Sequence, residues 1–508
     1  MWQHAAEFPV RGQSSDMIQL EHPLNLCQRL GVCLACLASS TLIACSVHEV
    51  DTNPLPGIDA PDEYASTIEV DTSSGHATEP SRGAWWHEFD DPDLSRTITE
   101  SLASNLTAGE FAARVFAARA IARQAGAERL PALDGTGSLG WSSLDEDGIG
   151  DAIDRVEFAG DVGFVVSWEA DVFGRLRSRE QAAAFDAEAA RDDFGAVLLS
   201  VSADVAAAYY AAVEQRLLLE LLRDQIDRDV TLLGLIELRF AQGDATGLDI
   251  LRQRAQLADA RALVPGARAA LRQAENALDA LDGVAADGED RVSAVFPSLP
   301  RVPAAGVPAD LLANRPDLRA AQRRLVAVDF EIAEAIADRL PRFNIIGSLA
   351  YADAPSGSGF AASAAAGVVA PLIDWGRRQA VVDERQAEYQ SLLAAYASLY
   401  VNAIAEVDTL LYAEQRTREE VAVLSERVDL LDRAVVEARN RYVNGIGDYT
   451  DVLIALDDLQ ETQRDLLSAE GSLVQQRIEV YRASGGVIGK GTDVTEEHLS
   501  REVSEASL

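Results

Sequence analysis

The 508-residue chain is long enough for two or three ordinary domains, and it is strongly acidic, with 82 Asp and Glu against 44 Lys and Arg. An excess of negative charge argues against nucleic acid as a partner. The six histidines all lie outside the span between residues 94 and 486, which holds the periodic sequence. This weakens any reading built on a catalytic His triad or a His-ligated metal, so neither an enzyme nor a cofactor is expected.

The N-terminal segment holds all four cysteines: Cys27, Cys33, Cys36 and Cys45. Here Arg29 precedes an apolar run that ends in small residues and is too short to be a convincing spanning helix, which is the pattern of a secretory signal. The run ends in Leu42-Ile43-Ala44-Cys45, which resembles the bacterial lipobox, where the cysteine is diacylated and becomes the new N-terminus. Residues 1–44 are therefore predicted to be a lipoprotein signal peptide. A disulfide or metal site among the cysteines is the alternative.

Two details refine the lipoprotein prediction. Met17 is an alternative start, because residues 1–16 make a long preface to the signal. Ser46, directly after the predicted lipidated Cys45, fits sorting to the outer membrane. The following stretch, residues 45–93, is rich in Pro, Asp, Ser, Thr and Gly and has no clear period over most of its length, which predicts a tether or an irregular wrap.

A first structural unit is predicted over residues 94–283. A helical pattern runs to about Arg129, and the apolar period then changes from 3.6 to 2 over residues about 131–143 and 156–169, which predicts two amphipathic strands. From Gly174 to Phe240 the pattern is helical again, for about 100 Å at about 1.5 Å per residue. A turn at about 240–248 leads into a return helix.

The long helix carries a seam of apolar residues with alternating spacings of three and four, which is the signature of coiled-coil packing. Gln215 and Asp229 interrupt the seam. Its predicted members are Leu198, Val201, Val205, Ala208, Ala212, Leu219, Leu222, Ile226, Leu233, Ile236 and Phe240.

Residues 309–486 repeat this plan after a linker at 284–308, with strands at about 341–352 and 360–372 and a hairpin tip at about 442–450. Equivalent residues of the two long hairpins are 202 positions apart, as shown by Arg239 and Arg441 and by the seam itself. The sequence therefore predicts a mainly helical fold with membrane β-strands, built from a duplicated unit of helix, strand, strand, long helix and helix. An acidic tail, residues 487–508, follows.

Four strands of membrane-crossing length cannot close a barrel, for which about eight are needed, so strands from several chains must be pooled. Interfacial aromatics fit this reading, since Trp141, Trp168 and Tyr351 fall near strand ends. The alternative is a soluble antiparallel sheet that caps a coiled coil.

Five stretches carry a family resemblance: "WWHEFDDPDL", "WEADVFGRLRS", "LLANRPDLRAAQRRL", "RYVNGIGDYTDVLIALDDL" and "YRASGG". With the lipobox they make residues 85–486 similar to the TolC-like outer-membrane efflux factors, in the NodT-like lipoprotein branch that works with resistance-nodulation-division (RND) pumps. The resemblance implies a homotrimer with a 12-stranded outer-membrane β-barrel, continued by a periplasmic coiled-coil α-barrel. It also implies a passive conduit, without catalysis, whose periplasmic end contacts an adaptor protein and an inner-membrane RND pump.

The same resemblance assigns roles at the two hairpin tips. Tyr442 is expected to hydrogen-bond Asp249, and Asp451 is expected to line the constriction of the periplasmic gate. This chain departs from the family pattern at Gly447, where a gate arginine is usual, and at Ile454, where a second pore aspartate is usual. The bland alternative is that both aspartates are helix-start residues favoured by the helix dipole.

The tips themselves are expected to contact the adaptor, through Gly243, Asp244, Gly445 and Gly447. Glycine suits such turns because it accepts a positive φ without a Cβ clash. Two other functions remain open: the duct of a protein-secretion or metal-cation efflux system, and a lipid-tethered periplasmic coiled-coil scaffold without a pore.

Overall fold

The computed structural model describes residues 47–59, 61–65, 85–144, 155–286, 288, 292–293, 295–299, 308–354 and 357–486. The predicted signal peptide, the lipidation site Cys45 and the acidic tail 487–508 lie outside the described residues.

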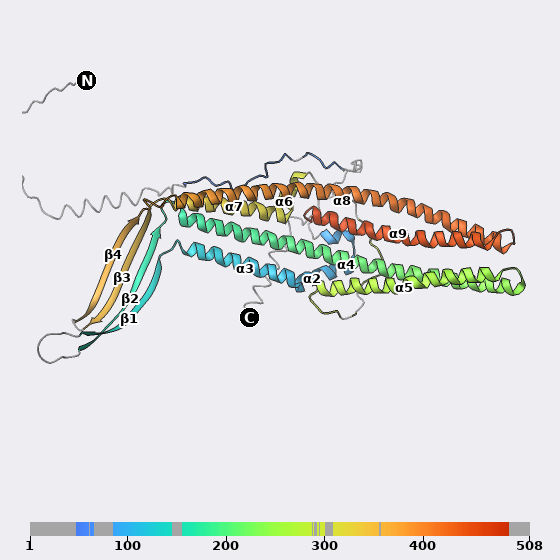
Figure 1. The fold of residues 1–508 in the computed structure, drawn as a ribbon, viewed down its shortest axis with the longest axis horizontal. Coiled ribbons are helices and arrows are strands. Elements are labelled where there is room, and N and C mark those ends of the chain that lie inside the picture. The colour runs from blue at the N-terminus through green and yellow to red at the C-terminus, as the bar shows by residue number, and fades with distance from the viewer. Residues whose placement is uncertain are drawn as a thin grey trace, which may run out of the picture. The chain divides into compact units, whose positions relative to one another are not determined.

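The two predicted units have the same order of elements (Figure 1). The first comprises the 3₁₀ helix η1 (Trp85–Phe89), α2 (Pro92–Ser104), α3 (Leu106–Ala127), β1 (Ala132–Leu144), β2 (Arg155–Ala170), α4 (Arg175–Gln242) and α5 (Gly247–Leu281). The second comprises η2 (Pro308–Asp310), α6 (Leu311–Asn314), α7 (Pro316–Ala337), β3 (Arg342–Ala354), β4 (Gly357–Val369), α8 (Arg377–Val443) and α9 (Tyr449–Ala483).

The first helix of each unit is broken, where the sequence predicted a continuous one. In the first unit Asn105 ends α2 and caps α3, because its side chain accepts from the Ala108 N–H at 3.0 Å and donates to the Leu281 carbonyl at 2.7 Å. In the second unit Arg315 precedes Pro316, and a residue before proline is excluded from the helical region by steric clash. Both breaks therefore have local causes.

The four strands form one antiparallel sheet in the order β1-β2-β3-β4. The register places the predicted apolar positions on a single face, as shown by the pairs Leu133↔Val166 and Phe164↔Leu349. The other face carries polar residues, among them Asp134 and Asp161. The predicted alternation is confirmed. Among the described residues, β1 and β4 each leave one edge without a strand partner.

One strand was placed too late in the chain. The strand predicted at about 360–372 is β4, which begins at Gly357, since Ser358 and Gly359 pair with Asp353 and Ala352. The strand ends at Val369, two residues before Pro371, which has no N–H to give to a ladder.

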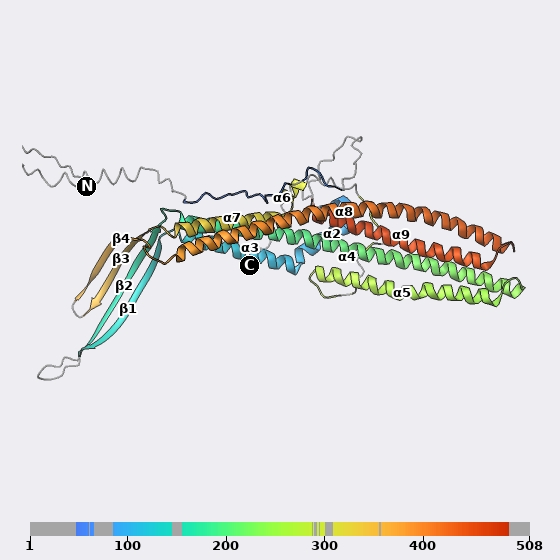
Figure 2. The same ribbon diagram turned by 45° about the horizontal axis from the view of Figure 1, so that its top comes forward.

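The helices form a wall in the same order as the strands: α3 lies beside α4, α4 beside α7 and α7 beside α8 (Figures 1 and 2). Each strand thus continues into a helix without a crossing. An apolar stretch of α4 is long enough to cross a membrane, but 61% of it is buried inside the fold. We therefore interpret α4 as a core helix of this wall.

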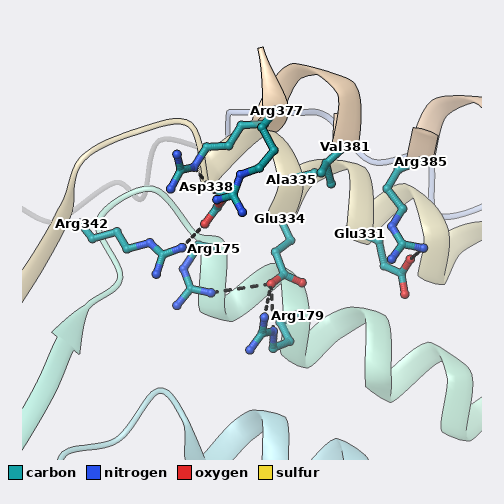
Figure 3. Close-up of a pocket in the computed structure, with 11 residues that line it drawn as sticks. Arg175, Arg179, Glu331, Glu334, Ala335, Asp338, Arg342, Arg377, Val381 and Arg385 are labelled. Atoms are coloured by element: carbon teal, nitrogen blue, oxygen red, sulfur yellow. Dashed lines mark hydrogen bonds and ion pairs between the residues drawn. The ribbon is translucent and has the colours of Figure 1, made fainter. Parts of the chain in front are cut away.

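The sheet and the wall meet in a layer of ion pairs (Figure 3), beside which a pair of aromatic rings packs. Phe173, in the connection from β2 to α4, packs against Phe343 at the start of β3, with ring centroids 6.3 Å apart. The residue 202 positions later, Trp375, lies between β4 and α8 and is 96% exposed. The aromatic residue at this position thus packs against the next strand after the first unit, but has no such neighbour within the described part of the chain after the second unit.

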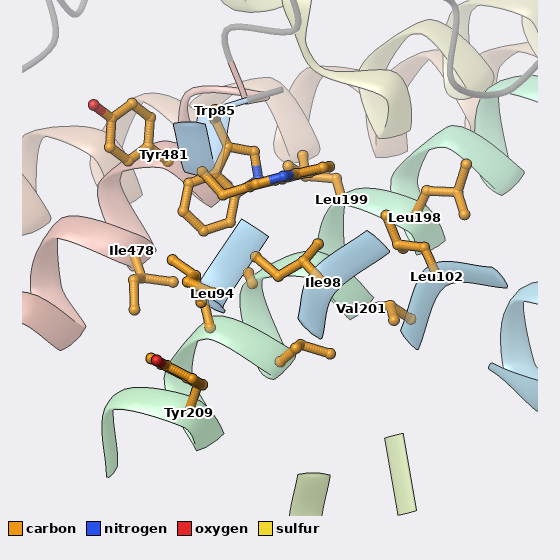
Figure 4. Close-up of a cluster of buried hydrophobic side chains, with 14 of the residues drawn as sticks. Trp85, Leu94, Ile98, Leu102, Leu198, Leu199, Val201, Tyr209, Ile478 and Tyr481 are labelled. Atoms are coloured by element: carbon orange, nitrogen blue, oxygen red, sulfur yellow. The ribbon is translucent and has the colours of Figure 1, made fainter. Parts of the chain in front are cut away.

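The largest hydrophobic core lies around η1 and α2, between α4 and α9 (Figure 4). Trp85 is fully buried, stacks on Tyr481 with ring centroids 5.4 Å apart, and donates its indole N–H to Ser202 at 3.0 Å. Leu94 and Ile98 of α2 pack into the same cluster. Burying side chains of this size is worth about 1.5–3 kcal/mol each, so the "WWHEF" motif is structural: it ties the two units together.

Along α8 the seam expected 202 positions after that of α4 is buried at Tyr400, Ala403, Val407 and Tyr442, but Leu411 is buried in place of the predicted Leu410. The predicted seam of α4 is wrong near the tip. Leu232 and Ile236 are buried there, whereas the predicted Phe240 is 50% exposed. The true spacing passes through Gln225 and Asp229, both fully buried. Asp229 was read as an interruption, yet it is itself a member of the seam, because amide groups from the facing helices hydrogen-bond its carboxylate.

Candidate functional site: the two hairpin tips

The two hairpin tips share one backbone conformation. Gly243 and Gly445 adopt φ values of 89° and 73°. In the first tip the Asp244 N–H donates to the Arg239 carbonyl at 2.9 Å, and in the second the Ile446 N–H donates to the Arg441 carbonyl at 3.0 Å. This six-residue closure is the Schellman motif that ends helices at a glycine. The repeated sequence thus encodes the same turn twice.

The helices that follow the turns begin differently. Thr246 caps α5 in a capping box with Asp249: the Asp249 carboxylate accepts from the Thr246 N–H at 2.9 Å and from its hydroxyl at 2.8 Å. Asp249 is nearly buried in this arrangement. At the equivalent start of α9 the cap is Asp448, which accepts from the Thr450 N–H at 3.0 Å.

The expected hydrogen bond between Tyr442 and Asp249 is not formed. The Asp249 carboxylate is occupied by the capping box, and the Tyr442 hydroxyl, although buried, has no hydrogen-bond partner among the described residues. Burial and the nearby negative charge of Asp249 raise the pKa of Tyr442, and Arg239 opposes this. That prediction is therefore wrong for this conformation of the chain.

Asp451, the repeat equivalent of Asp249, has a different environment. It lies in the first turn of α9, is exposed, and its carboxylate forms no hydrogen bond or ion pair with the residues that the structure describes. Duplication therefore produced one aspartate that stabilises its own helix start and one whose charge is available to solvent. Of the two, Asp451 is the one that could act on ions or solutes.

The departure at Gly447 has a steric basis. A Cβ at this position would lie 3.0 Å from the Arg441 Cβ and 3.3 Å from the Tyr442 nitrogen. The tip must shift before any side chain, including the arginine usual in the family, fits there. Ile454, at the other departure, is 56% exposed, so this face of α9 carries an apolar group in place of a charge.

Two arginines of the first hairpin hold the second hairpin, and the sequence reasoning missed both roles. Arg239 donates to the Val443 carbonyl at 3.0 Å, and its guanidinium lies 4.6 Å from the centre of the Tyr442 ring. Arg252 donates to the Thr450 hydroxyl at 2.8 Å. The only hint was that Arg239 and Arg441 are repeat equivalents, which says nothing of what each one touches.

Behind the tips, a buried polar chain also joins the hairpins. Tyr449 of α9 donates to Gln253 of α5, and Gln253 donates to the Asp229 carbonyl of α4 at 3.1 Å. Gln460 of α9 donates to the Asp229 carboxylate at 3.1 Å, whose other oxygen has no partner among the described residues. Burial raises the pKa of Asp229. Buried polar groups at such a contact fix its register because shifting them leaves them unpaired.

The part of the chain that the structure describes contains no group of three or more His, Cys, Asp or Glu placed to hold a metal ion.

A sequence model of the family described as outer membrane efflux protein matches residues 97–284 and 307–486. The chain belongs to this family. It is 30% identical over 405 residues to the solvent efflux pump outer membrane protein SrpC of Pseudomonas putida, an alignment that covers 78% of this chain and 86% of SrpC. It is 26% identical over 408 residues to the cation efflux system protein CusC of Escherichia coli, covering 79% and 88%.

The fold agrees with that membership. The solved structure of the outer-membrane channel OprN superimposes with a TM-score of 0.75 at 25% identity, over 87% of this chain and 99% of OprN. The resemblance to TolC-like outer-membrane channels and the location in the outer membrane are thereby confirmed. SrpC is named as the outer membrane protein of an efflux pump and OprN as an outer-membrane channel. The sheet, with one apolar and one polar face, is the part of this efflux protein suited to lipid.

Proposed function

We propose that this efflux protein is a passive trimeric conduit that carries small molecules from the periplasm to the exterior. The observation that supports the proposal is the sheet, which has one apolar face and an open edge on both β1 and β4. Exposed edges cannot persist in a bilayer, because unpaired backbone groups there cost several kcal/mol each. Three chains with four strands each close a barrel of 12, and the wall of α3, α4, α7 and α8 continues it.

The partners follow from the position of the tips. The turns at Gly243 and Gly445 are exposed and lie at the ends of the long helices farthest from the sheet (Figure 1). They are the surfaces for a periplasmic adaptor protein, which in turn connects to an inner-membrane RND pump that supplies the energy. We also propose the division of the chain given in the sequence analysis, into signal peptide, tether, two repeated units with a linker, and tail. Cys45 is then the lipid anchor in the outer membrane.

The cargo class remains general. Names of relatives cover both solvents and cations, and the relationship to CusC is the one observation that favours a metal-cation efflux duct as the second candidate.

The conduit is tested with purified full-length protein. We expect a heat-modifiable, detergent-stable trimer that gives single-channel currents in planar bilayers. A folded protein that stays monomeric and passes no current contradicts the conduit and supports a lipid-tethered scaffold. The anchor is tested separately by intact mass of membrane-extracted protein: a chain beginning at Cys45 with added acyl mass is expected, and any other N-terminus or an unmodified cysteine contradicts it.

The gate proposal assigns Asp451 to the constriction. Three symmetry-related copies near the axis form a ring of like charges that attracts polyvalent cations. Asp451→Ala is expected to weaken block by a trivalent cation, added from the periplasmic side, by about tenfold or more. Asp244→Ala, which removes an exposed tip charge from the other hairpin, is the matched control. Unchanged block in Asp451→Ala means that Asp451 is only a helix-start residue.

A further inference from the structure

A polar hollow of about 570 Å³ lies where the sheet meets the helical wall (Figure 3). Its walls come from the starts of α4, β3 and α8 and from the end of α7. Six arginines line it: Arg175, Arg179, Arg342, Arg377, Arg378 and Arg385. Such a concentration of guanidinium groups is unusual in a chain with a formal net charge of −38.

The carboxylates that line the hollow are fewer than the arginines. Glu334 is shared between Arg175, at 3.7 Å, and Arg179, at 2.7 Å. Asp338 is likewise shared between Arg342 and Arg378. The third lining carboxylate, Glu331, pairs with Arg385 at 3.0 Å.

Further carboxylates engage several of these arginines from positions outside the lining: Glu169, Glu128, Asp374 and Glu388. They hold the guanidinium groups in place. Together with Glu331, Glu334 and Asp338 they make seven carboxylates against six arginines, so the formal charge of the arginines is fully offset. Arg377 is the exception, since it forms no ion pair with a described residue. The hollow therefore offers oriented N–H donors, those of Arg377 first, and no net positive charge to a solute that enters it.

The hollow borders the polar face of the sheet. Arg342 and Glu169 belong by strand alternation to the face of the sheet that carries Asp134 and Asp161. In a barrel with lipid outside, that face lines the interior.

The N-terminal segment gives an independent indication. His48 and the Asp51 N–H contact Asp329 of α7 at 2.6 and 2.9 Å. Asp338 follows Asp329 by nine residues, or about two and a half helical turns at about 3.6 residues per turn, and so lies on the opposite face of α7. The segment that leads to the proposed lipid anchor thus runs along one side of the wall, and the hollow opens on the other.

We propose that this hollow binds anionic solutes that carry two or more carboxylate or phosphate groups, inside the conduit; its placement there rests on the proposed function. Guanidinium groups bind such groups through paired N–H donors of fixed geometry. The arginines come from three separate elements, so they can bind separate anionic groups of one solute. This is why we expect solutes with more than one anionic group to be preferred. The volume lies within the range of small-molecule sites. Three copies in a trimer make a ring of anion sites in an otherwise acidic protein.

The test measures binding of inorganic tripolyphosphate to the detergent-solubilised full-length protein by calorimetry at about 0.15 M KCl, near physiological ionic strength. Arg377→Gln is the informative variant, because that side chain stabilises no described ion pair. Loss of one charge-assisted contact is expected to weaken binding about tenfold. The matched control is Arg416→Gln on the same helix, far from the hollow, where Arg416 contacts two residues about one turn away, Glu419 through an ion pair and the ring of Tyr412.

Binding by the unchanged protein, a loss of about tenfold in Arg377→Gln and no loss in Arg416→Gln support the site. No binding, or equal binding in both variants while trimers persist on gels, overturns it. Planar-bilayer currents keep the two proposals apart. Channels that conduct while tripolyphosphate neither binds nor blocks refute the anion site alone, whereas binding without any current refutes the conduit and leaves the hollow as an anion site.

Discussion

Removal of the Arg239 side chain is expected to release the second hairpin tip from the first. The charged hydrogen bond to the Val443 carbonyl is worth about 1.5–3 kcal/mol. The cation–π contact with the Tyr442 ring adds about 0.5–1 kcal/mol at a partly exposed site. Water can hydrogen-bond the Val443 carbonyl once Arg239 is removed, which recovers part of this free energy. Arg239→Ala should therefore weaken the contact between the hairpins by about 2 kcal/mol per chain. At about 1.4 kcal/mol per tenfold, the equilibrium between joined and separated tips shifts about thirtyfold.

The assay is the open fraction of single channels in planar bilayers, which should rise in Arg239→Ala. The matched control is Arg254→Ala, because Arg254 is an exposed arginine of the same hairpin whose ion-pair partner, Glu237, lies in that hairpin too. It removes the same charge without touching α8 or α9. If both variants stay as closed as the unchanged protein, the contacts of Arg239 do not hold the gate.

Three further outcomes follow from the contacts described above. Tyr442→Phe should leave the open fraction and the melting temperature nearly unchanged, because the hydroxyl has no partner; a marked rise in opening would show that the hydroxyl bonds another group in the assembled trimer. Asp229→Asn should remove a pH dependence: burial raises the pKa of Asp229, so the unchanged protein gains stability relative to the variant as pH falls from 7 towards the ordinary pKa, and parallel melting curves would refute this. Arg477→Leu leaves buried Glu414 paired, among the described residues, only with the partly exposed Arg418, and should lower the free energy of unfolding by about 3–5 kcal/mol per chain. The double variant with Glu414→Ala should lose far less, as measured by denaturant unfolding. If the losses of the two single variants simply add, the two residues are not coupled.

The architecture was readable from the sequence because its signals are periodic and occur twice. The two strands of each unit, its long helix and its glycine turn each produce a recognisable pattern in the sequence. The same pattern recurs at a fixed offset, as between Arg239 and Arg441, so each unit supports the assignment of the other. The side-chain contacts at the tips were not readable, because they depend on which groups face each other across helices far apart in the chain. Asp249 and Asp451 occupy equivalent positions, yet only the first has a threonine three residues before it to close a capping box.

The seam of α4 shows a second limit. An apolar residue such as Phe240 looks like a core position, and a buried Asp229 looks like an interruption, when only polarity is considered. The facing helices decide otherwise by supplying amide donors to the carboxylate. In such a seam a polar residue is buried and an apolar residue is exposed, contrary to the usual distribution. A prediction that follows only the apolar residues therefore places the buried positions one residue away from where they lie.

The joint at Phe173 has a consequence for how chains meet. Inside one chain, Phe173 from the end of the first unit closes onto Phe343 at the first strand of the next unit. Trp375 lies at the same place after the second unit, and Leu133 is the second residue of β1, as Phe343 is the second residue of β3. In a closed ring of three, the first strand that follows Trp375 is β1 of the neighbouring molecule. If the proposed trimer forms, the contact within one molecule is thus the pattern for the contact between two, and the ring consists of six nearly equal units that are covalently linked in pairs.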